Sequence, residues 1–225
     1  MQGKKLVKKD LNPNIYLSDE NKKLQNDEFN RFLIWSIPAV VTCLWKTALC
    51  EKFCYARKAE IQYKDALPCR LRSLEESKKE TFVNDMIVTI TYNLSRPLFQ
   101  GKKVWFRIHE SGDFYSLEYL KKWIEIARAC PTVNFLAYTK AVRLVELVKD
   151  EFPSNFVIRY SVWADTKPEE LEIANKLQLP IYTAYAPKIL DQKVREENYN
   201  KCDCDCQLCK NCYSYDNKRI AVAIH

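Results

Sequence analysis

The sequence predicts an α/β protein with a mainly parallel sheet, which six strands can form either as an open doubly wound sheet or, as we expect here, as a partial (β/α)6 barrel. Two observations favour this fold class. Short runs rich in β-branched and aromatic residues recur along the chain, as expected for strands that are buried on both faces. Between them lie stretches whose apolar residues have helical spacing, and strands that alternate with helices form parallel sheets.

Six runs are candidate strands, and the first contains the longest apolar stretch of the chain. In chain order they are Phe32–Val41, Lys103–His109, Val133–Tyr138, Asn155–Val162, Pro180–Ala186 and Lys218–Ile224. None approaches the roughly 20 apolar residues that a membrane-spanning helix needs. We therefore expect a protein without a membrane segment. We also expect a cysteine-rich loop before the last strand.

The helical stretches lie between the candidate strands. A long apolar pattern from about Arg70 to Leu94 follows the first strand. The others have their apolar faces at Leu117–Ala127, Leu144–Val148 and Leu171–Leu177. Thr166 and Glu169 have the spacing of a capping box, so we expect the last of these helices to begin there.

Length and charge limit the classes of function. A chain of 225 residues with 47% hydrophobic residues supports one sizeable core, so we expect a polar arm over 1–30 and a single α/β domain over 31–225. The N-terminus lacks the apolar segment of a secretory signal, which predicts a cytoplasmic location. Lys and Arg exceed Asp and Glu by 36 to 29, giving a formal charge of +7, but the two signs are interleaved. Nucleic-acid binding therefore has little support from charge.

Cysteine is the most informative residue type, with 10 in the chain. One group follows the first strand and consists of Cys43, Cys50 and Cys54. The other precedes the last strand and consists of Cys202, Cys204, Cys206, Cys209 and Cys212. Dense cysteine in a reducing compartment indicates metal or redox chemistry rather than disulfides. Cys69 and Cys130 stand apart from both groups, and we expect them to be buried as small hydrophobic side chains.

The first group has the spacing C-x6-C-x3-C directly after a buried strand. Its three thiolates suit three irons of a [4Fe–4S] cluster, which leaves the fourth iron open to a cofactor or substrate. A zinc site would normally have a fourth Cys or His nearby, and the loop contains none. The pattern therefore favours an open-site cluster held by Cys43, Cys50 and Cys54.

The second group contains C-x2-C-x2-C from Cys206 to Cys212, which resembles the three-cysteine run of bacterial ferredoxins. Cys202 or Cys204 would complete four ligands, which predicts a metal-binding loop over 202–212 and a second [4Fe–4S] cluster. A tetrahedral zinc site is the main alternative, and a set of redox-active thiols is another. A further alternative is one cluster shared by both groups, with a late cysteine as its fourth ligand.

Polar residues follow the second strand, at the edge where parallel sheets place their active sites. They are Arg107, His109, Ser111, Gly112 and Asp113. Glycine is rare, with 3 in the chain, and Gly112 would allow a tight turn and close approach to a ligand. Asp113 is a candidate acceptor from an ammonium group, and His109 is a candidate acid–base residue. The alternative is a structural turn in which Asp113 or Ser116 caps the next helix.

A three-cysteine loop after the first strand of a partial barrel resembles the radical S-adenosylmethionine (SAM) enzymes. Their usual spacing is C-x3-C-x2-C with an aromatic residue before the last cysteine, and Phe53 holds that place before Cys54. The resemblance implies an enzyme whose open cluster binds SAM and cleaves its sulfonium with an electron from a donor such as ferredoxin or flavodoxin. It also implies catalytic roles for His109 and Asp113, on a substrate that the sequence does not identify. The cofactor-binding residues would be Phe53, Tyr55, Arg107, Ser111, Gly112 and Lys140.

A wider resemblance runs through most of the chain. Its motifs are C-x6-C-x3-C-Y-A, R-x-H-x-S-G-D-F over Arg107–Phe114, Y-T-K over Tyr138–Lys140, the late cysteines and the terminal Ile-His. This set resembles a phage and plasmid family named for gene product 88, for which no activity is established. Two other functions therefore stay open. One is a zinc-stabilised protein that binds nucleic acid or has a structural role, and the other is an iron–sulfur protein that only carries electrons or senses redox state.

Overall fold

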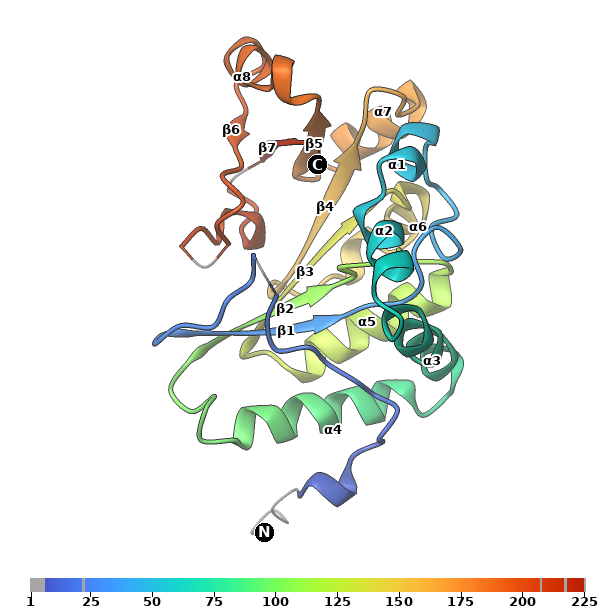
Figure 1. The fold of residues 1–225 in the computed structure, drawn as a ribbon, viewed down its shortest axis with the longest axis vertical. Helices are drawn as coiled ribbons and strands as arrows, with labels where there is room; N and C mark the ends of the chain where they lie inside the picture. The colour runs from blue at the N-terminus through green and yellow to red at the C-terminus, as the bar shows by residue number, and fades with distance from the viewer. Residues whose placement is uncertain (1–6, 22, 207, 217, 225) are drawn as a thin grey trace.

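The framework of the fold is a parallel sheet, seen in a computed structural model that describes residues 7–21, 23–206, 208–216 and 218–224. The strands are β1 (Asn30–Trp35), β2 (Lys103–Ile108), β3 (Val133–Thr139), β4 (Phe156–Val162), β5 (Ile181–Tyr185), β6 (Asn200–Lys201) and β7 (Arg219–Ala223). All pair in parallel in the order β1-β2-β3-β4-β5-β7-β6, and the sheet curls into a half-barrel (Figure 1). The expectation of a mainly parallel α/β sheet is confirmed.

Helices connect most of the strands. They are α1 (Ala48–Lys52), α2 (Tyr55–Gln62), α3 (Ala66–Lys78), α4 (Phe82–Ser95), α5 (Leu117–Ala129), α6 (Val142–Leu147), α7 (Pro168–Lys176) and α8 (Pro187–Glu196), with the short 3-10 turns η1 (Lys8–Asp10), η2 (Lys149–Glu151) and η3 (Asn211–Tyr213). Within the described residues, none of these helices has the length and apolar character needed to cross a membrane.

Over the described residues, the sheet has seven strands rather than the six expected. β6 is two residues long, too short to produce a periodic pattern, and it pairs with β7 at the edge. β1 ends at Trp35 instead of Val41 because the chain leaves the sheet there. The amide of Ile37 donates to the carbonyl of Ser111 at 3.1 Å, so the apolar residues after Trp35 belong to a loop.

The helices also differ from the predicted pattern. α1, α2 and α8 have no counterpart among the predicted helices, and the stretch from Arg70 to Leu94 contains parts of two. α3 and α4 separate at Lys79, whose extended backbone, with a ψ of 151°, breaks the helical path. α7 begins at Pro168, but without a capping box: the hydroxyl of Thr166 accepts from the amide of Trp163 at 2.8 Å and closes the preceding turn.

The two faces of the sheet pack against different partners, because successive side chains of a strand point to opposite sides. On the outer face, Trp35 packs on Phe82 of α4 and Phe106 packs on Trp123 of α5, each with ring centroids 5.5 Å apart. The inner face carries a separate apolar cluster. It consists of Leu24, Phe32, Ile34 and Trp105, with Cys206 and Tyr213 packed against it.

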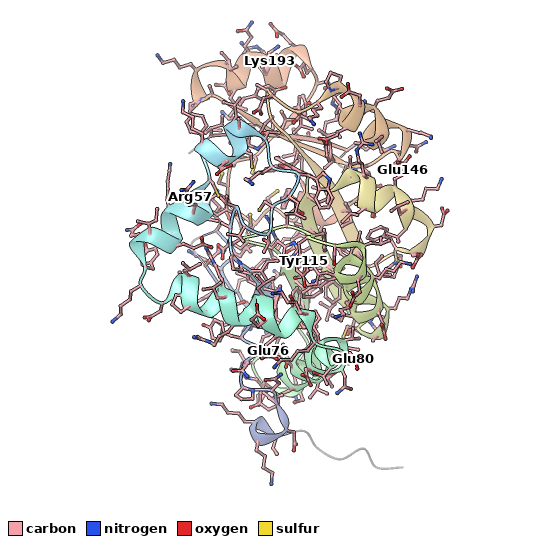
Figure 2. The ribbon with its side chains drawn as sticks, turned by 90° about the vertical axis from the view of Figure 1, so that its right-hand side faces the viewer. Arg57, Glu76, Glu80, Tyr115, Glu146 and Lys193 are labelled. Atoms are coloured by element: carbon pink, nitrogen blue, oxygen red, sulfur yellow. The ribbon has the colours of Figure 1, made fainter. Side chains whose placement is uncertain are left out.

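The predicted N-terminal arm is packed on the domain in its described part. Ser18 and Ile34 exchange backbone hydrogen bonds of 3.1 Å and 2.8 Å, which covers the free edge of β1. The side-chain amide of Asn12 donates to Glu76 of α3, labelled in Figure 2, at 3.0 Å. Residues 1–6 lie outside the described residues.

The segment between β6 and β7 crosses the inner face, because a tight hairpin cannot join two parallel strands. Arg159 of β4, which is fully buried, fixes this segment with three hydrogen bonds to backbone carbonyls. The acceptors belong to Asn211 at 2.8 Å, Cys212 at 2.7 Å and Ser214 at 2.7 Å. The late cysteines therefore lie on the side of the sheet away from α4 and α5 (Figure 1).

Candidate functional site

A cavity of about 490 Å³ lies at the C-terminal ends of the strands, between the two cysteine groups. This volume is in the range of small-molecule sites. The cysteines on its wall are Cys43, Cys50, Cys54, Cys202, Cys204, Cys206 and Cys212. The other predicted site residues line the same cavity: Phe53, Tyr55, Arg107, His109, Ser111, Gly112, Asp113 and Lys140. Cys209 alone among the predicted site residues does not border it, and Cys69 and Cys130 lie elsewhere.

The helix α1 presents Cys50 to the cavity. Thr47 precedes this helix, and its hydroxyl accepts from the amide of Cys50 at 3.2 Å. The carboxylate of Asp165, which follows β4, accepts from the amide of Leu49 at 2.8 Å. These two contacts cap the helix and tie it to the far side of the cavity.

The helix α2 presents Cys54. Its sulfur accepts from the amide of Arg57 at 3.4 Å, so the positive end of the helix dipole faces the sulfur and favours negative charge there. The side chain of Arg57 is largely exposed on the outer side of α2 (Figure 2). Next to Cys54, the hydroxyl of Tyr55 donates to the carbonyl of Glu110 at 2.5 Å and links α2 to the loop after β2.

Glu60 anchors the cysteine segment to the rest of the domain. Its Oε1 accepts from the amide of Ala39 at 2.8 Å, the guanidinium of Arg70 at 2.9 Å and, more weakly, the hydroxyl of Ser111 at 3.4 Å. The side chains of Glu60 and Arg70 are only 9% and 12% exposed, so water screens their ion pair little. One buried carboxylate thus joins α2, α3 and the loops after β1 and β2.

Gly112 has a left-handed backbone with a φ of +90°. A Cβ at this position would lie 2.4 Å from Cγ1 of Ile37 and 2.8 Å from Oγ1 of Thr42, closer than real contacts allow. Glycine therefore lets the loop after β2 pack against the chain that leads into Cys43. The close approach is made to the protein's own chain, although Gly112 also lines the cavity.

Two non-glycine residues at this edge also have positive φ angles, Val40 at 64° and His109 at 63°. For a β-branched side chain such as that of Val40, this backbone is a strained one, at a cost of about 1–3 kcal/mol. The carbonyl of Val40 accepts from the amide of Cys43 at 3.2 Å. A strained turn thus presents the first cysteine, and strain of this kind concentrates at functional sites.

Asp113 is buried and joins the ends of β2 and β3. Its oxygens accept from the hydroxyl of Thr139 at 2.6 Å, the amide of Lys140 at 2.9 Å and the amide of Phe114 at 2.7 Å. Burial raises the pKa of this carboxyl above its ordinary value, and the hydrogen bonds only partly oppose that shift. Asp113 does not cap the following helix, because Ser116 does.

His109 is buried, and burial together with the charge of Arg107 lowers its pKa to about 3. Its Nε2 lies 3.0 Å from the hydroxyl of Tyr119, which already accepts from Nε1 of Trp35 at 3.0 Å. The hydrogen of the Tyr119 hydroxyl needs an acceptor, so Nε2 takes it and the ring proton lies on Nδ1. Among the described residues, Nδ1 has no hydrogen-bond partner. Near neutral pH the ring is therefore a neutral donor.

Lys140 places a buried positive charge beside the first cysteine group. Its ammonium donates to the carbonyl and hydroxyl of Ser161 at 2.8 Å and 2.9 Å. Burial lowers its pKa, which the neighbouring Cys50 partly opposes. Burial also raises the pKa of the Cys50 thiol, and Lys140 acts against that rise. The rings of Phe53 and Trp163 stack nearby at 6.3 Å between centroids.

Arg107 lies near Cys206 and Cys212 of the late group, and it borders both the large cavity and a smaller one of about 40 Å³. All five late cysteines line the smaller cavity, including Cys209. The guanidinium carbon of Arg107 lies 3.9 Å from the ring centroid of Tyr138, and Nε donates to the carbonyl of His109 at 3.2 Å. The Tyr138 ring against one face of the guanidinium and the hydrogen bond from Nε thus hold Arg107 in place.

Hydrogen-bond donors surround the late cysteines. The hydroxyl of Tyr182 donates to the sulfur of Cys202 at 4.0 Å, and the ammonium of Lys23 donates to the sulfur of Cys204 at 3.6 Å. Sulfur atoms that receive hydrogen bonds and face cations are favourable sites for negative charge. The N-terminal segment, through Lys23, therefore completes one wall of this site.

Burial raises the pKa of several thiols in both cysteine groups and so favours their protonated form near neutral pH. It raises the pKa of Cys43 and of Cys202 to about 12, and that of Cys206 to about 11. Burial also raises the pKa of Cys212, against a hydrogen bond from Tyr138 and the charges of the nearby arginines. Because cysteine binds a metal as the thiolate, metal binding at these thiols must displace protons.

The described residues contain no preformed site for a metal ion: no three or more of their Cys, His, Asp or Glu side chains form a group that could hold one. In a [4Fe–4S] cluster each cysteine binds its own iron, so the ligands stand farther apart than they would around one ion. Lys140 and Arg107 would offset the charge of the thiolates.

Sequence reasoning missed several residues that build the site, above all Glu60 and Arg159. A signal for Arg159 does exist, because a single arginine interrupts the otherwise apolar strand Phe156–Val162. Charged side chains are seldom fully buried without partners, so this arginine predicts buried acceptors nearby. Glu60 has no such signal, since a glutamate on a short, exposed helix is ordinary.

Comparison with known proteins shows which family the chain resembles. A family model described as "Gene product 88" matches residues 15–184, which include the first cysteine group and end before the late cysteines. The gene 88 protein of Mycobacterium phage L5 is 29% identical over 143 residues, covering 61% of this chain and 57% of that protein. The gene 88 protein of Mycobacterium phage D29 is 28% identical over the same shares. The chain thus spans little more than half the length of these relatives.

The comparisons give no support to the resemblance to radical SAM enzymes. No solved structure matches the chain. The terminal His225 of the motif set lies outside the described residues. The family model, in contrast, matches more than half of the chain, including the segment Arg107–Phe114 that carries the most distinctive motif. The chain belongs to the gene product 88 family.

Proposed function

We propose that this protein is an iron–sulfur enzyme in which Cys43, Cys50 and Cys54 bind an open-site [4Fe–4S] cluster at the mouth of the half-barrel. The observation that carries the proposal is that two cysteine groups, from distant parts of the sequence, line one cavity of about 490 Å³. Thiolates are the usual ligands of such clusters. Three cysteines leave one iron without a thiolate, and the remaining cavity gives room for a ligand there.

The late cysteines, in the same proposal, bind a second centre. All five line a cavity of their own, and Cys209 borders only that one, which favours two centres over one shared cluster. A second [4Fe–4S] cluster is preferred to zinc because the C-x2-C-x2-C run from Cys206 to Cys212 resembles that of bacterial ferredoxins. Lys23 and Tyr182 already donate to sulfur atoms of this group, as the outer contacts of a thiolate-ligated centre should.

An open cluster supplies single electrons to a ligand on its free iron, and SAM is the ligand that we propose, with electrons from a donor such as ferredoxin or flavodoxin. The residues of the chain bind and orient that ligand. Lys140 and Arg107 line the cavity with positive charge, and Asp113 and Ser111 line it with oxygen atoms. Phe53 forms part of the aromatic wall. The substrate is a small or macromolecular compound that enters the same cavity.

The test is metal analysis of protein that is purified without oxygen. We expect a brown protein that contains iron and sulfide, and an EPR signal of the reduced protein that changes when SAM is added. Replacing Cys43, Cys50 and Cys54 together with Ala should remove about one cluster's worth of iron. Cys69→Ala, which removes a cysteine outside both cavities, is the matched control and should keep the iron.

Other results would contradict the proposal in distinct ways. A colourless protein with stoichiometric zinc would support a zinc-stabilised protein that binds nucleic acid or has a structural role. Iron and sulfide without any effect of SAM would support an electron carrier or a redox sensor. A triple variant that keeps the iron content of the wild type would show that the first cysteine group is not a ligand set.

A further inference from the structure

Two arginines lie on the inner face of the sheet, and the protein uses them differently. Arg159 donates to three backbone carbonyls and holds the segment before β7 in place. Arg107 donates from Nε to the carbonyl of His109 and stacks on Tyr138. Over the described residues, its two terminal nitrogens have neither a hydrogen-bond acceptor nor a carboxylate within ion-pair distance.

His109 follows Arg107 at the same strand end, but its ring packs in the outer-face core, against Phe114 and Tyr119 with ring centroids 4.7 Å and 5.6 Å away. Its Nδ1 is fully buried, so a ligand in the cavity does not reach it. The terminal nitrogens of Arg107 are therefore the donors that this strand end offers to such a ligand.

The charges on the cavity wall are mainly positive. The charged residues that line it are Lys23, Lys46, Arg107, Lys140, Glu110 and Asp113. Both acids are already engaged, Asp113 by three hydrogen bonds within the protein and Glu110 by the amide of Asn21 at 2.7 Å. An anionic ligand is therefore favoured by the field of the cavity and meets no carboxylate at Arg107.

We infer that Arg107, on the mainly positive wall of the cavity, forms an oxyanion-binding subsite, which takes the carboxylate or phosphate group of a small molecule in the cavity. The inference rests on the proposed function, because it names the class of ligand that the same site receives. The planar guanidinium gives two parallel N–H donors to two oxygens of the anion, the geometry in which arginine binds carboxylates and phosphates.

A competing role for Arg107 is to balance the charge of metal-bound thiolates, since it lies near Cys206 and Cys212. That role needs a positive charge at this position and nothing more. Oxyanion binding also needs the planar fork of two donors, which lysine lacks. The substitution Arg107→Lys therefore separates the two roles, because it keeps the charge and removes the fork.

The experiment is calorimetric titration of the full chain, purified without oxygen, with inorganic phosphate and with succinate. Succinamide, the uncharged analogue of succinate, is the ligand control. Arg143→Gln, which removes an exposed arginine of α6, is the protein control. We expect the wild type and Arg143→Gln to bind one of the two anions alike, and Arg107→Lys to bind it at least about tenfold more weakly. Equal binding by wild type and Arg107→Lys, or no anion binding by folded wild type, overturns the inference.

Repeating the titration in the presence of SAM identifies the source of the oxyanion. Loss of phosphate or succinate binding when SAM is present assigns the subsite to the carboxylate of that cofactor. Binding that persists beside SAM assigns it to a separate substrate. Either result supports the subsite, because the anion must bind to the wild-type protein before competition with SAM can be measured.

A measurement on the wild type covers the case in which the Arg107 variants do not fold. Phenylglyoxal modifies arginine side chains, and peptide mass spectrometry reports the modified positions. Bound phosphate should slow modification of Arg107 and leave Arg143 unchanged, whereas equal rates with and without phosphate would overturn the inference. If phosphate protects Arg107 in protein that contains no iron, the proposed function is wrong and the subsite is supported. If iron-loaded protein binds no anion, the subsite is wrong and the proposed function still stands.

Discussion

At the scale of single residues, Gly112 shows how a rare residue type marks a packing constraint. Gly101 and Gly112 both have positive φ angles, but a Cβ at Gly101 would have open space while one at Gly112 would meet Ile37 and Thr42. We expect Gly101→Ala to lower the free energy of unfolding by about 1 kcal/mol, the strain of a left-handed backbone. Gly112→Ala should lower it by about 3 kcal/mol, because overpacking is added to strain. Urea unfolding of both variants measures this difference, and equal losses would contradict the packing argument.

The neutral state of His109 predicts how stability depends on pH. Its pKa is about 3 in the folded protein, where burial and Arg107 disfavour the charged ring, against 6.5 in an unperturbed histidine. Between these values the unfolded chain binds a proton that the folded protein does not, so stability falls as pH falls from 6.5 towards 3. His109→Gln, which cannot titrate, should lose less stability over this range. Denaturant unfolding of both proteins at matched metal content tests this, and parallel pH curves would contradict it.

At the scale of elements, the sheet could be predicted from the sequence and the cysteine-bearing helices could not. Strands such as Lys103–Ile108 are buried on both faces, which leaves a clear apolar run. α1 and α2 are five and eight residues long and contribute mainly half-buried or exposed side chains, so no apolar stripe forms. Tertiary contacts fix them instead: Asp165 reaches α1 from the loop after β4, and Glu60 joins α2 to Arg70. Sequence spacing does not reveal such contacts.

The ion pair between Glu60 and Arg70 should therefore control the stability of the element that carries Cys54. We expect Glu60→Gln to lower the free energy of unfolding by about 3 kcal/mol, because Arg70 then keeps a mostly buried charge without its carboxylate. Glu75→Gln is the matched control, since Glu75 pairs with Lys78 on the exposed side of α3, and it should cost less than about 1 kcal/mol. Thermal or urea unfolding reports both values. A similar small loss for the two variants would mean that other contacts hold α2.

At the scale of the whole molecule, the convergence of the site follows from topology. Parallel strands bring their C-terminal ends to one edge, so Cys43, His109 and Lys140 could be expected to meet there from their positions after the first three strands. The way in which the late cysteines reach that edge could not be predicted. It depends on a crossover between β6 and β7 that is fixed by Arg159, and on an N-terminal segment that brings Lys23 to Cys204.

This crossover has few apolar residues of its own, which leads to a prediction about the protein with and without metal. A centre bound by the late cysteines should order residues 202–216, because binding replaces thiol protons and its free energy becomes folding free energy. Hydrogen exchange of this segment should be slow in the metal-loaded protein and fast after the metal is removed, while β1 to β4 stay protected. Cys212→Ser should resemble the metal-free protein, and Cys69→Ser, the control, should not.

The pKa values of the late cysteines give the sign of the pH effect on metal binding. Burial holds the pKa of Cys202 at about 12 and that of Cys206 at about 11, so protons compete with the metal throughout the neutral range. Metal affinity should therefore fall as pH falls, and exchange in the late segment should quicken at lower pH even when the rest of the sheet is unchanged. A late segment that is equally protected with and without metal would show that Arg159 and the inner-face cluster order it alone, and that the late cysteines do not form a structural metal centre.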